Sequence, residues 1–412
     1  MKNVYIIDDY SSSKINGIGT YIKELLFCLK GTGMNICQIE CFHETKTFKM
    51  EMINGIKQIQ FPKIINSDIQ YYSIIDKFLR LYIQDSYENV FFFNHTPNEF
   101  FVKTVKISFP LSKLIFVIHD MVWTASMLGD ESKMKKYVVV QSRELFAKEY
   151  PELLSNFENE KGMYETVQKI IALSLETIEF LQRVYNIDNQ KITFISNGLR
   201  DTDRCNINDK KIQLRTKLLI PLHEKLIVFA GRVREVKGIY RVVSSLKNVA
   251  KTYLNFRLIV IGTVFEMKKM MEYAGEIVTK ITFTGQISKE RLNEWYQIAD
   301  MGVLASYWEQ CSYTGIEMMM HGLPVVASDG FCVGDMFKDG INAKVARIGD
   351  RNNPDEFENN LTEAFLELLQ SPELCEKLGR TGREMYESKY HINNMKEGYR
   401  KLLNSLDCVA TS

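Results

Sequence analysis

The chain has 412 residues, of which 25% are charged and 45% hydrophobic, and this length predicts two or three folded domains. Its 52 basic and 51 acidic residues give a formal net charge of +1, which argues against a protein drawn as a whole to nucleic acid or to an anionic membrane. The ordinary composition excludes a disordered or collagen-like chain.

The cysteines and the apolar runs indicate in which part of the cell the protein works. None of the eight cysteines forms a C-x-x-C or zinc-finger spacing, so we expect reduced, mostly buried thiols. The first apolar run, Val4–Ile7, is too short for a signal peptide, and no run reaches the roughly 18 residues of a membrane span. We therefore expect a cytoplasmic protein with at most peripheral membrane contact and no nucleic-acid partner.

Short apolar runs alternate with amphipathic segments through the first half of the chain. Gly17-Ile18-Gly19 opens a helical pattern whose apolar face includes Tyr21 and Leu25. Residues 122–167 are charged and aromatic and too long for a simple connection, so we expect helices there and interpret them as part of an acceptor-binding surface. The expected strands are Val4–Ile7, Asn89–Phe93, Leu114–Ile118, Ile170–Leu173 and Ile192–Ile195.

The second half repeats this alternation, and residues from Glu373 to about Leu406 have a helical pattern. Two successive arrays of this kind predict two doubly wound α/β domains, separated within the polar stretch Asp201–Lys211. Further strands are expected at Leu226–Ala230, Leu258–Ile261, Ile281–Thr284, Gly302–Ala305 and Pro324–Ala327, and helices at Glu290–Ile298, Tyr313–Met320 and Pro354–Leu369.

A glycine, an arginine and a lysine follow one buried strand. The strand ends at Ala230, Gly231 and Arg232 come next, and Lys237 lies five residues further on, before a helix. Ligands bind at the carboxyl ends of strands in open α/β sheets, and two cations there suit a diphosphate. A solvated charged loop is an equally good interpretation of this spacing.

Two carboxylates flank a second strand-to-helix turn. Glu309 precedes the expected helix, and Glu317 lies inside it beside a run of three methionines. Amide groups at the helix start, around Cys311, Ser312, Tyr313 and Thr314, can face an anion, and a carboxylate there can accept hydrogen bonds from sugar hydroxyls. Alternatively, Glu309 is a charge near the helix N-terminus that the helix dipole stabilises, and Glu317 is a surface residue.

Two weaker signals lie in the first half. Gly17 and Gly19 form half of a dinucleotide fingerprint, which an ordinary turn explains as well. His119 follows an expected strand, where its side chain can exchange a proton or recognise a hydroxyl. A purely structural role for this histidine fits the sequence equally well.

Together these residues resemble the retaining glycosyltransferases of family 4, which have the GT-B fold. The most specific match is Glu309-x7-Glu317 followed by His321–Asp329, with the G-R-x4-K-G motif of Gly231–Gly238 upstream. Ile195–Gly198 matches the family's P-N-G turn with serine in place of proline. The residues Gln310-Cys311-Ser312 depart from the family's glycine-rich pattern. The sequence Glu309–Tyr313, with the nearby methionine run, resembles a subgroup of this family that is encoded beside peptide-modifying enzymes. This resemblance would make the acceptor a peptide.

The resemblance implies two Rossmann-like domains facing a central cleft: residues 1–203 on the acceptor side, residues 204–388 binding the nucleotide sugar, and residues 389–412 as a helix that packs back on the first domain. Its implied reaction is metal-independent transfer of a hexose, with retention, from a UDP- or GDP-linked sugar to a hydroxyl of a glycan, lipid-linked sugar or peptide. No further cofactor is implied. The alternatives are a nucleotide-sugar epimerase or hydrolase on the same fold, or a non-catalytic partner subunit.

The resemblance also implies a role for each candidate residue. Arg232 and Lys237 would hold the diphosphate beside Gly231, Glu317 would bind the ribose, and Glu309 would bind the transferred sugar near its 3-hydroxyl. His119 would contact the sugar or orient the acceptor. The remaining donor-binding positions would be Gly17, Gly19, Cys311, Ser312, Tyr313 and Thr314.

Overall fold

The computed structural model describes residues 1–13, 17–64, 67–94, 99–140, 142–201 and 207–406. The chain divides into two compact units. Unit 1 comprises Met1–Met127, Glu131–Gly198 and the residues from Ile392 onward, and unit 2 comprises Leu128–Asp130 and Leu199–His391. The boundary predicted between residues 203 and 204 lies outside the described residues.

Unit 1 is built on an eight-stranded sheet with the order β3-β4-β2-β1-β5-β6-β7-β8. Neighbouring strands are parallel except β3 and β4, which form an antiparallel hairpin. The strands are β1 (Asn3–Asp9), β2 (Asn35–His43), β3 (Lys49–Ile53), β4 (Ile56–Pro62), β5 (Asn89–Phe93), β6 (Lys113–Val117), β7 (Lys169–Ala172) and β8 (Ile192–Phe194). All of β5 is buried, as expected for a parallel strand covered on both faces.

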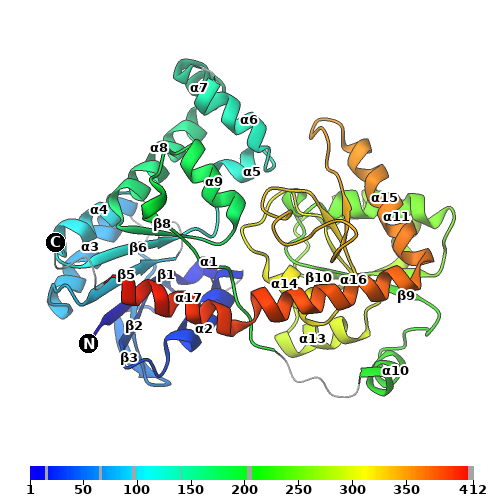
Figure 1. The fold of residues 1–412 in the computed structure, drawn as a ribbon, viewed down its shortest axis with the longest axis horizontal. Helices are drawn as coiled ribbons and strands as arrows, with labels where there is room; N and C mark the ends of the chain where they lie inside the picture. Colours follow the sequence, from blue (N-terminus) through cyan, green and yellow to red (C-terminus); the bar gives the residue numbers. More distant parts are fainter. Residues whose placement is uncertain (14–16, 65–66, 95–98, 141, 202–206, 407–412) are drawn as a thin grey trace. The chain divides into compact units, whose positions relative to one another are not determined.

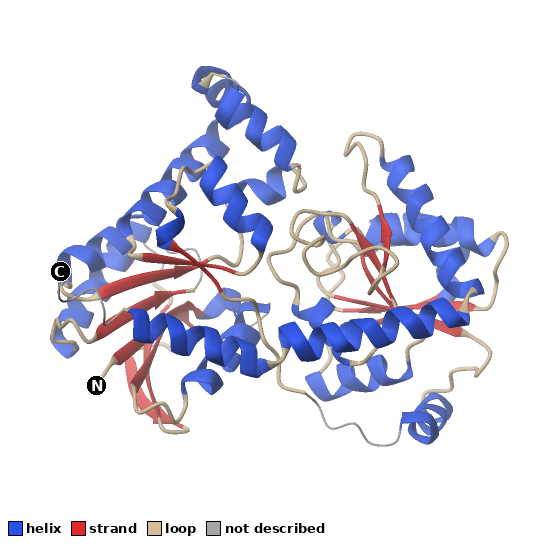
Figure 2. Cartoon of the chain, in the orientation of Figure 1, coloured by secondary structure: helices blue, strands red, loops and turns tan. Residues whose placement is uncertain are grey.

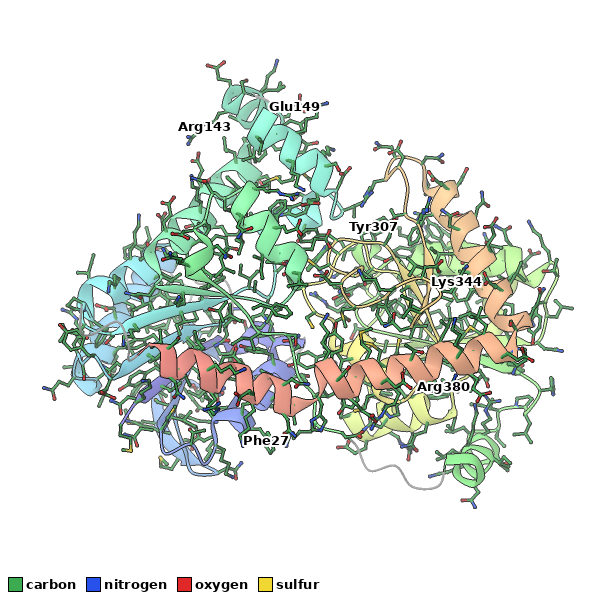
Figure 3. The ribbon with its side chains drawn as sticks, viewed as in Figure 1. Phe27, Arg143, Glu149, Tyr307, Lys344 and Arg380 are labelled. Atoms are coloured by element: carbon green, nitrogen blue, oxygen red, sulfur yellow. The ribbon has the colours of Figure 1, made fainter. Side chains whose placement is uncertain are left out.

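Helices lie on both sides of each sheet (Figure 2). In unit 1 they are α1 (Tyr10–Ser13), α2 (Gly17–Leu29), α3 (Asp68–Tyr82), α4 (Glu99–Ser108), α5 (Val122–Ser126), α6 (Glu131–Lys135), α7 (Arg143–Glu149), α8 (Pro151–Thr166), α9 (Leu175–Arg183) and α17 (Ile392–Ser405). A π-helical turn covers Lys136–Val140, and a 3₁₀ turn covers Asn189–Lys191. Most of the described residues between 122 and 167 are therefore helical, as predicted, and Figure 3 labels Arg143 and Glu149 at the two ends of α7.

The C-terminal helix α17 belongs to unit 1. It packs against α2, where the Tyr399 and Tyr21 hydroxyls hydrogen-bond (Figure 1). At Gly398 an added Cβ atom would lie 3.0 Å from the Ile195 side chain, so the absence of a side chain allows α17 to approach the segment after β8. Apart from the short segment Leu128–Asp130, the chain thus leaves unit 1 after Gly198 and returns to it at Ile392.

Unit 2 contains a six-stranded parallel sheet with the order β11-β10-β9-β12-β13-β14. Its strands are β9 (Lys225–Ala230), β10 (Phe256–Ile261), β11 (Ile281–Gly285), β12 (Met301–Leu304), β13 (Val325–Ser328) and β14 (Lys344–Ala346). Its α-helices are α10 (Ile207–Lys217), α11 (Ile239–Ala250), α12 (Met267–Ala274), α13 (Lys289–Ile298), α14 (Tyr313–Met320), α15 (Pro354–Gln370) and α16 (Pro372–Met385). Shorter helical turns cover Glu235–Lys237, Gly275–Lys280 and Tyr386–Tyr390.

Two Rossmann-like sheets, parallel except for the β3–β4 hairpin, confirm the predicted α/β class. Strands β2, β3, β4 and β14 were not predicted, and a buried polar cluster in β2 and β4 explains part of this omission. On one face of β2 and β4, the Glu40 carboxylate accepts hydrogen bonds from the Gln38 and Gln60 side-chain amides at 3.1 and 3.0 Å. These polar residues are buried, so the segments do not read as continuous apolar runs. The helical pattern after Glu373 is also interrupted, because α16 ends in a π-helical turn before α17 begins.

Within the described part of the chain, Cys28, Cys37, Cys41, Cys311 and Cys332 are buried free thiols and Cys375 is a half-buried one. This agrees with the expectation of mostly buried thiols, while Cys205 and Cys408 lie outside the described residues. No helix in the described ranges has both the length and the apolarity needed to cross a membrane.

Candidate active site

The centre of the candidate site in unit 2 is an ion pair between two predicted residues. The Lys237 ammonium lies 2.6 Å from Oε1 of Glu309, although 72 residues separate them in the chain. Both side chains are largely buried. The same ammonium lies 5.3 Å from the centre of the Trp308 ring, so Lys237 has a negative and an aromatic neighbour on one loop. The fold therefore brings together the two motifs that the sequence offered separately.

Glycine at position 238 permits this approach. Gly238 has a left-handed φ of 65°, and an added Cβ atom would lie 2.0 Å from the Ala305 carbonyl oxygen. The Tyr307 amide also donates to the Val236 carbonyl at 3.0 Å, which holds the turn after β9 against the loop after β12. Figure 3 labels Tyr307 in this loop. A side chain at position 238 would push the two loops, and hence Lys237 and Glu309, apart.

Ser306 is a second partner of Glu309 that the sequence interpretation missed. Its hydroxyl donates to Oε1 of Glu309 at 2.7 Å, and the Ser306 side chain is only 1% exposed. The Ser306 carbonyl in turn accepts a hydrogen bond from the Ser328 hydroxyl at 2.5 Å. The sequence offers only a weak indication that Ser306 belongs to the site, namely that it is the first polar residue after the buried β12 strand.

Arg232 sits at the start of the same turn. Its backbone is held by its neighbours, because the Gly231 amide donates to the Ile261 carbonyl at 2.9 Å and the Val233 amide donates to the Thr263 carbonyl at 3.3 Å. The side chain is half-buried and makes no hydrogen bond or ion pair with the residues that the structure describes. A half-buried guanidinium in this state is a ready partner for an anionic ligand.

The second predicted carboxylate, Glu317, is 4% exposed and has both oxygens occupied. Lys289 pairs with Oε1, and the Tyr296 hydroxyl donates to Oε2 at 3.1 Å. Burial and the negative charge of Glu317 hold the pKa of Tyr296 well above its usual range, so this phenol remains a hydrogen-bond donor. Sequence reasoning found Glu317 but neither of its partners, which lie on α13.

The helix that carries Glu317 begins beside the ion pair. Ser312 caps α14, since its hydroxyl accepts a hydrogen bond from the Gly315 amide at 3.4 Å. The Ser312 amide itself points to the sulfur of Met336 at 3.1 Å, and the Thr314 hydroxyl donates to the Ala230 carbonyl at 3.4 Å. The first-turn amides of Tyr313 and Thr314 thus form the positive end of a helix near the end of β9.

The candidate residues in unit 1 lie at the carboxyl edge of its sheet. His119 follows β6 by two residues, and its ring meets Tyr21 edge-on with 4.5 Å between the ring centres. Gly17 is the first residue of α2, and Gly19 lies within its first turn. No group of three or more potential metal ligands among His, Cys, Asp and Glu occurs in the described residues.

Known proteins resemble both the sequence and the fold. The family described as "Glycosyl transferases group 1" matches residues 210–385, which include Arg232, Lys237, Glu309 and Glu317. The lipopolysaccharide 1,2-N-acetylglucosaminetransferase of Salmonella typhimurium is 24% identical over 311 residues, covering 72% of this chain and 77% of that protein. Alignments with further curated relatives span about half of those relatives, 46% and 47% of their lengths.

Two solved structures show the same fold over the whole chain. Sucrose-phosphate synthase from Thermosynechococcus elongatus superposes with a TM-score of 0.77 at 17% identity, covering 100% of both chains. The Anabaena protein HepE, in complex with UDP and glucose, gives a TM-score of 0.70 at 13% identity, covering 98% of this chain and 100% of HepE. The chain is thus similar to the group 1 glycosyltransferases over residues 210–385, and the solved structures show the same two-domain fold over nearly all of its length.

Proposed function

We propose that the protein is a family 4 enzyme that transfers a hexose, with retention of the anomeric configuration, from a UDP- or GDP-linked sugar to a hydroxyl acceptor. The observation that supports this most is the contact of Lys237 with Glu309, beside Arg232 and the start of α14. This arrangement offers two cations and helix amides to a diphosphate, and a carboxylate to a sugar.

Each side chain has a distinct task in this proposal. Arg232 and Lys237 bind the diphosphate beside Gly231 and stabilise the negative charge that develops on it as the sugar leaves, so the reaction needs no metal ion. Glu309 binds a hydroxyl of the transferred sugar, while Glu317 accepts hydrogen bonds from the ribose hydroxyls. Amide groups around Cys311–Thr314 hold the sugar and the phosphate.

The reaction exchanges one bond at the anomeric carbon for another on the same face. The bond to the diphosphate oxygen breaks, the acceptor oxygen forms the new bond, and the acceptor proton passes to the departing phosphate. The protein contributes positioning and charge stabilisation. In unit 1 we assign His119 to the sugar or the acceptor, and Gly17 and Gly19 to the diphosphate and acceptor side.

The comparisons bear on donor and acceptor as follows. HepE was crystallised with UDP, which favours a uridine donor, and the Salmonella relative is described as modifying lipopolysaccharide, which favours a glycan or lipid-linked acceptor. A peptide acceptor, which the residues around Cys311 suggested, is kept as a further candidate. Nothing in these matches supports the epimerase, hydrolase or non-catalytic alternatives. We place the reaction in the cytoplasm, where nucleotide sugars are made.

Incubation with UDP- and GDP-sugars tests the proposal. An octyl glycoside and a serine-containing peptide serve as acceptors, and NMR of the product reports the anomeric configuration. We expect transfer with retention, and loss of most activity in Glu309→Ala, Arg232→Ala and Lys237→Ala with the fold intact. An inverted product, an epimerised donor, or normal turnover in all three variants would contradict the proposal.

A further inference from the structure

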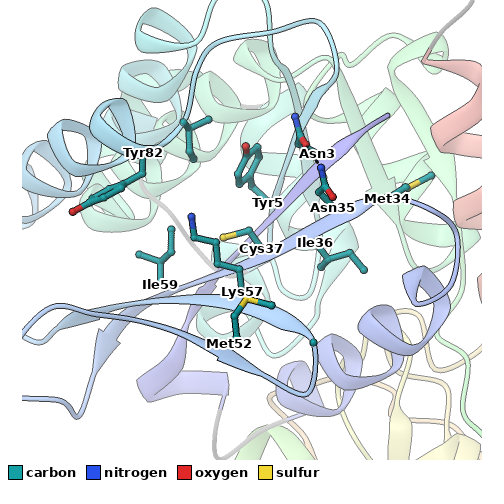
Figure 4. Close-up of a pocket in the computed structure, with 12 residues that line it drawn as sticks. Asn3, Tyr5, Met34, Asn35, Ile36, Cys37, Met52, Lys57, Ile59 and Tyr82 are labelled. Atoms are coloured by element: carbon teal, nitrogen blue, oxygen red, sulfur yellow. Dashed lines mark hydrogen bonds between the residues drawn. The ribbon is translucent and has the colours of Figure 1, made fainter.

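A separate cavity of about 330 Å³ opens in unit 1 at the amino ends of its strands (Figure 4). Its lining includes Asn3 and Asn35, the first residues of β1 and β2. Parallel α/β sheets bind their substrates at the opposite, carboxyl edge, where His119 and the start of α2 lie. The cavity, which we call the amino-edge pocket, is therefore distinct from the site assigned to sugar transfer.

Three chemically different side chains stand in one row on the pocket floor. Tyr5 of β1 pairs in register with Cys37 of β2, which pairs with Lys57 of β4, so all three project from the same face of the sheet. Figure 4 shows these side chains entering the space beside Tyr82. The Tyr5 ring stacks on Phe91 at 4.7 Å, which fixes the direction of its hydroxyl.

Two polar groups of this row, the Lys57 ammonium and the Tyr5 hydroxyl, can donate hydrogen bonds to a ligand. The Lys57 ammonium is half-buried and forms no ion pair or hydrogen bond within the described ranges of the chain, and the same is true of the Tyr5 hydroxyl. A half-buried ammonium with no negative partner would be stabilised by a bound anion. Lys57 and Tyr5 thus place two donors on one face of the sheet, on either side of Cys37, and a carboxylate can accept hydrogen bonds from both kinds of donor.

The thiol does not add covalent chemistry at neutral pH. Burial raises the pKa of Cys37 to about 11, against the smaller opposing effect of the Lys57 charge, so the thiol stays protonated and weakly nucleophilic. Burial likewise raises the pKa of Tyr5 to about 12, so its hydroxyl remains a donor. Tyr5, Cys37 and Lys57 can therefore bind a ligand reversibly, without forming a covalent bond to it.

Apart from Asn3 and Asn35, the side chains of the remaining wall are apolar or aromatic. Met34, Met52 and Tyr82 border the pocket, and Met52 and Tyr82 are 65% and 49% exposed. Methionine thioethers pack well against aromatic rings, and covering such surface is favourable by roughly 25 cal/mol per Å². A cavity of about 330 Å³ lies at the lower end of the range for small-molecule sites.

We propose that the amino-edge pocket binds a small aromatic carboxylate non-covalently, with Lys57 and Tyr5 holding the carboxylate and the two methionines and Tyr82 enclosing the ring. Such a ligand would act on the protein away from the transfer site. Its binding does not depend on the sugar-transfer activity.

Isothermal titration of the full chain with 3-phenylpropionate tests this proposal. We expect saturable 1:1 binding, at least tenfold weaker binding of the neutral 3-phenylpropanamide, and at least tenfold weaker binding of 3-phenylpropionate to Lys57→Gln. The matched control is Lys49→Gln, because Lys49 is an exposed lysine on the neighbouring strand β3 that does not line the pocket. This control should bind like the wild type, and thermal melts should show both variants folded.

Several results would overturn the inference. No saturable binding of 3-phenylpropionate would refute the pocket as a site for this ligand class. Equal affinities of the wild type and Lys57→Gln would refute the role of the ammonium, and equal affinity for octanoate would refute the preference for a ring. Displacement of 3-phenylpropionate by UDP would show that both occupy one site, against the proposed separation.

Discussion

Substituting Ser306 by alanine tests whether the geometry of Glu309 matters for the reaction. Ser306 donates a 2.7 Å hydrogen bond to Oε1 of Glu309, the oxygen that also contacts Lys237. Alanine deletes this donor without adding volume. The backbone should stay in place, because the Ser328 hydroxyl still holds the carbonyl of residue 306. Ser306 is thus a positioning residue that acts through Glu309.

The expected magnitude follows from these contacts. A hydrogen bond to a charged group contributes about 1.5–3 kcal/mol. Because Lys237 remains on the same oxygen, the carboxylate keeps its counter-ion, and we expect a loss near the lower limit of this range. At about 1.4 kcal/mol per factor of ten, this predicts a roughly tenfold fall in kcat. The KM for the nucleotide sugar should change little, since Glu309 is assigned to the sugar and the diphosphate ligands are intact.

Steady-state kinetics and a thermal melt on Ser306→Ala measure both quantities. The matched control is Ser245→Ala, because Ser245 is another fully buried serine of unit 2, with its hydroxyl donating to the Val242 carbonyl at 2.8 Å. Both variants should lose similar stability, but only Ser306→Ala should lose kcat. Unchanged kcat in Ser306→Ala, or an equal fall in the control, would refute the positioning role.

Three further predictions concern nucleotide binding, loop packing and pH. Tyr296→Phe removes one donor from Glu317 and should weaken UDP binding about tenfold in calorimetry; unchanged affinity would contradict the ribose assignment. Gly238→Ala places a Cβ atom 2.0 Å from the Ala305 carbonyl oxygen and should lower the free energy of unfolding in urea by roughly 2 kcal/mol or more; wild-type stability would contradict it. Burial raises the pKa of Glu160 to about 8. The folded state thus keeps a proton that the unfolded chain loses. The free energy of unfolding of the wild type should therefore fall by roughly 3 kcal/mol between pH 5 and pH 8, relative to that of Glu160→Gln. Parallel pH dependences of the two free energies of unfolding would contradict this prediction.

The sequence alone predicted the elements whose chemistry is local. Parallel strands buried on both faces read as continuous apolar runs, which is why Asn89–Phe93 was predicted with its observed bounds. Where buried side chains are polar and hydrogen-bonded to one another, as at Glu40 in β2, the strand does not form a continuous apolar run in the sequence. The local turn after β9 was also readable, because its glycine, arginine and lysine are close in sequence.

The remainder of the site depends on contacts between distant residues. The role of Ser306 is evident only from its 2.7 Å hydrogen bond to Glu309. The role of Tyr296 is evident only from its hydrogen bond to Glu317, which joins α13 to α14. The sequence interpretation placed Lys237 among the diphosphate ligands, but it did not foresee that the same ammonium pairs with Glu309. Such pairings are set by the strand order β9-β12 in the sheet rather than by spacing along the chain.

Calorimetric titration with UDP, GDP and ADP tests the central claim most directly, namely that Arg232 and Lys237 form a nucleotide-diphosphate site. The titrations use the wild type, Arg232→Ala and Lys237→Ala in buffer containing EDTA. We predict that at least one diphosphate binds the wild type without metal and that each substitution weakens this binding at least tenfold. Failure of all three nucleotides to bind, or equal affinity in wild type and variants, would contradict the account.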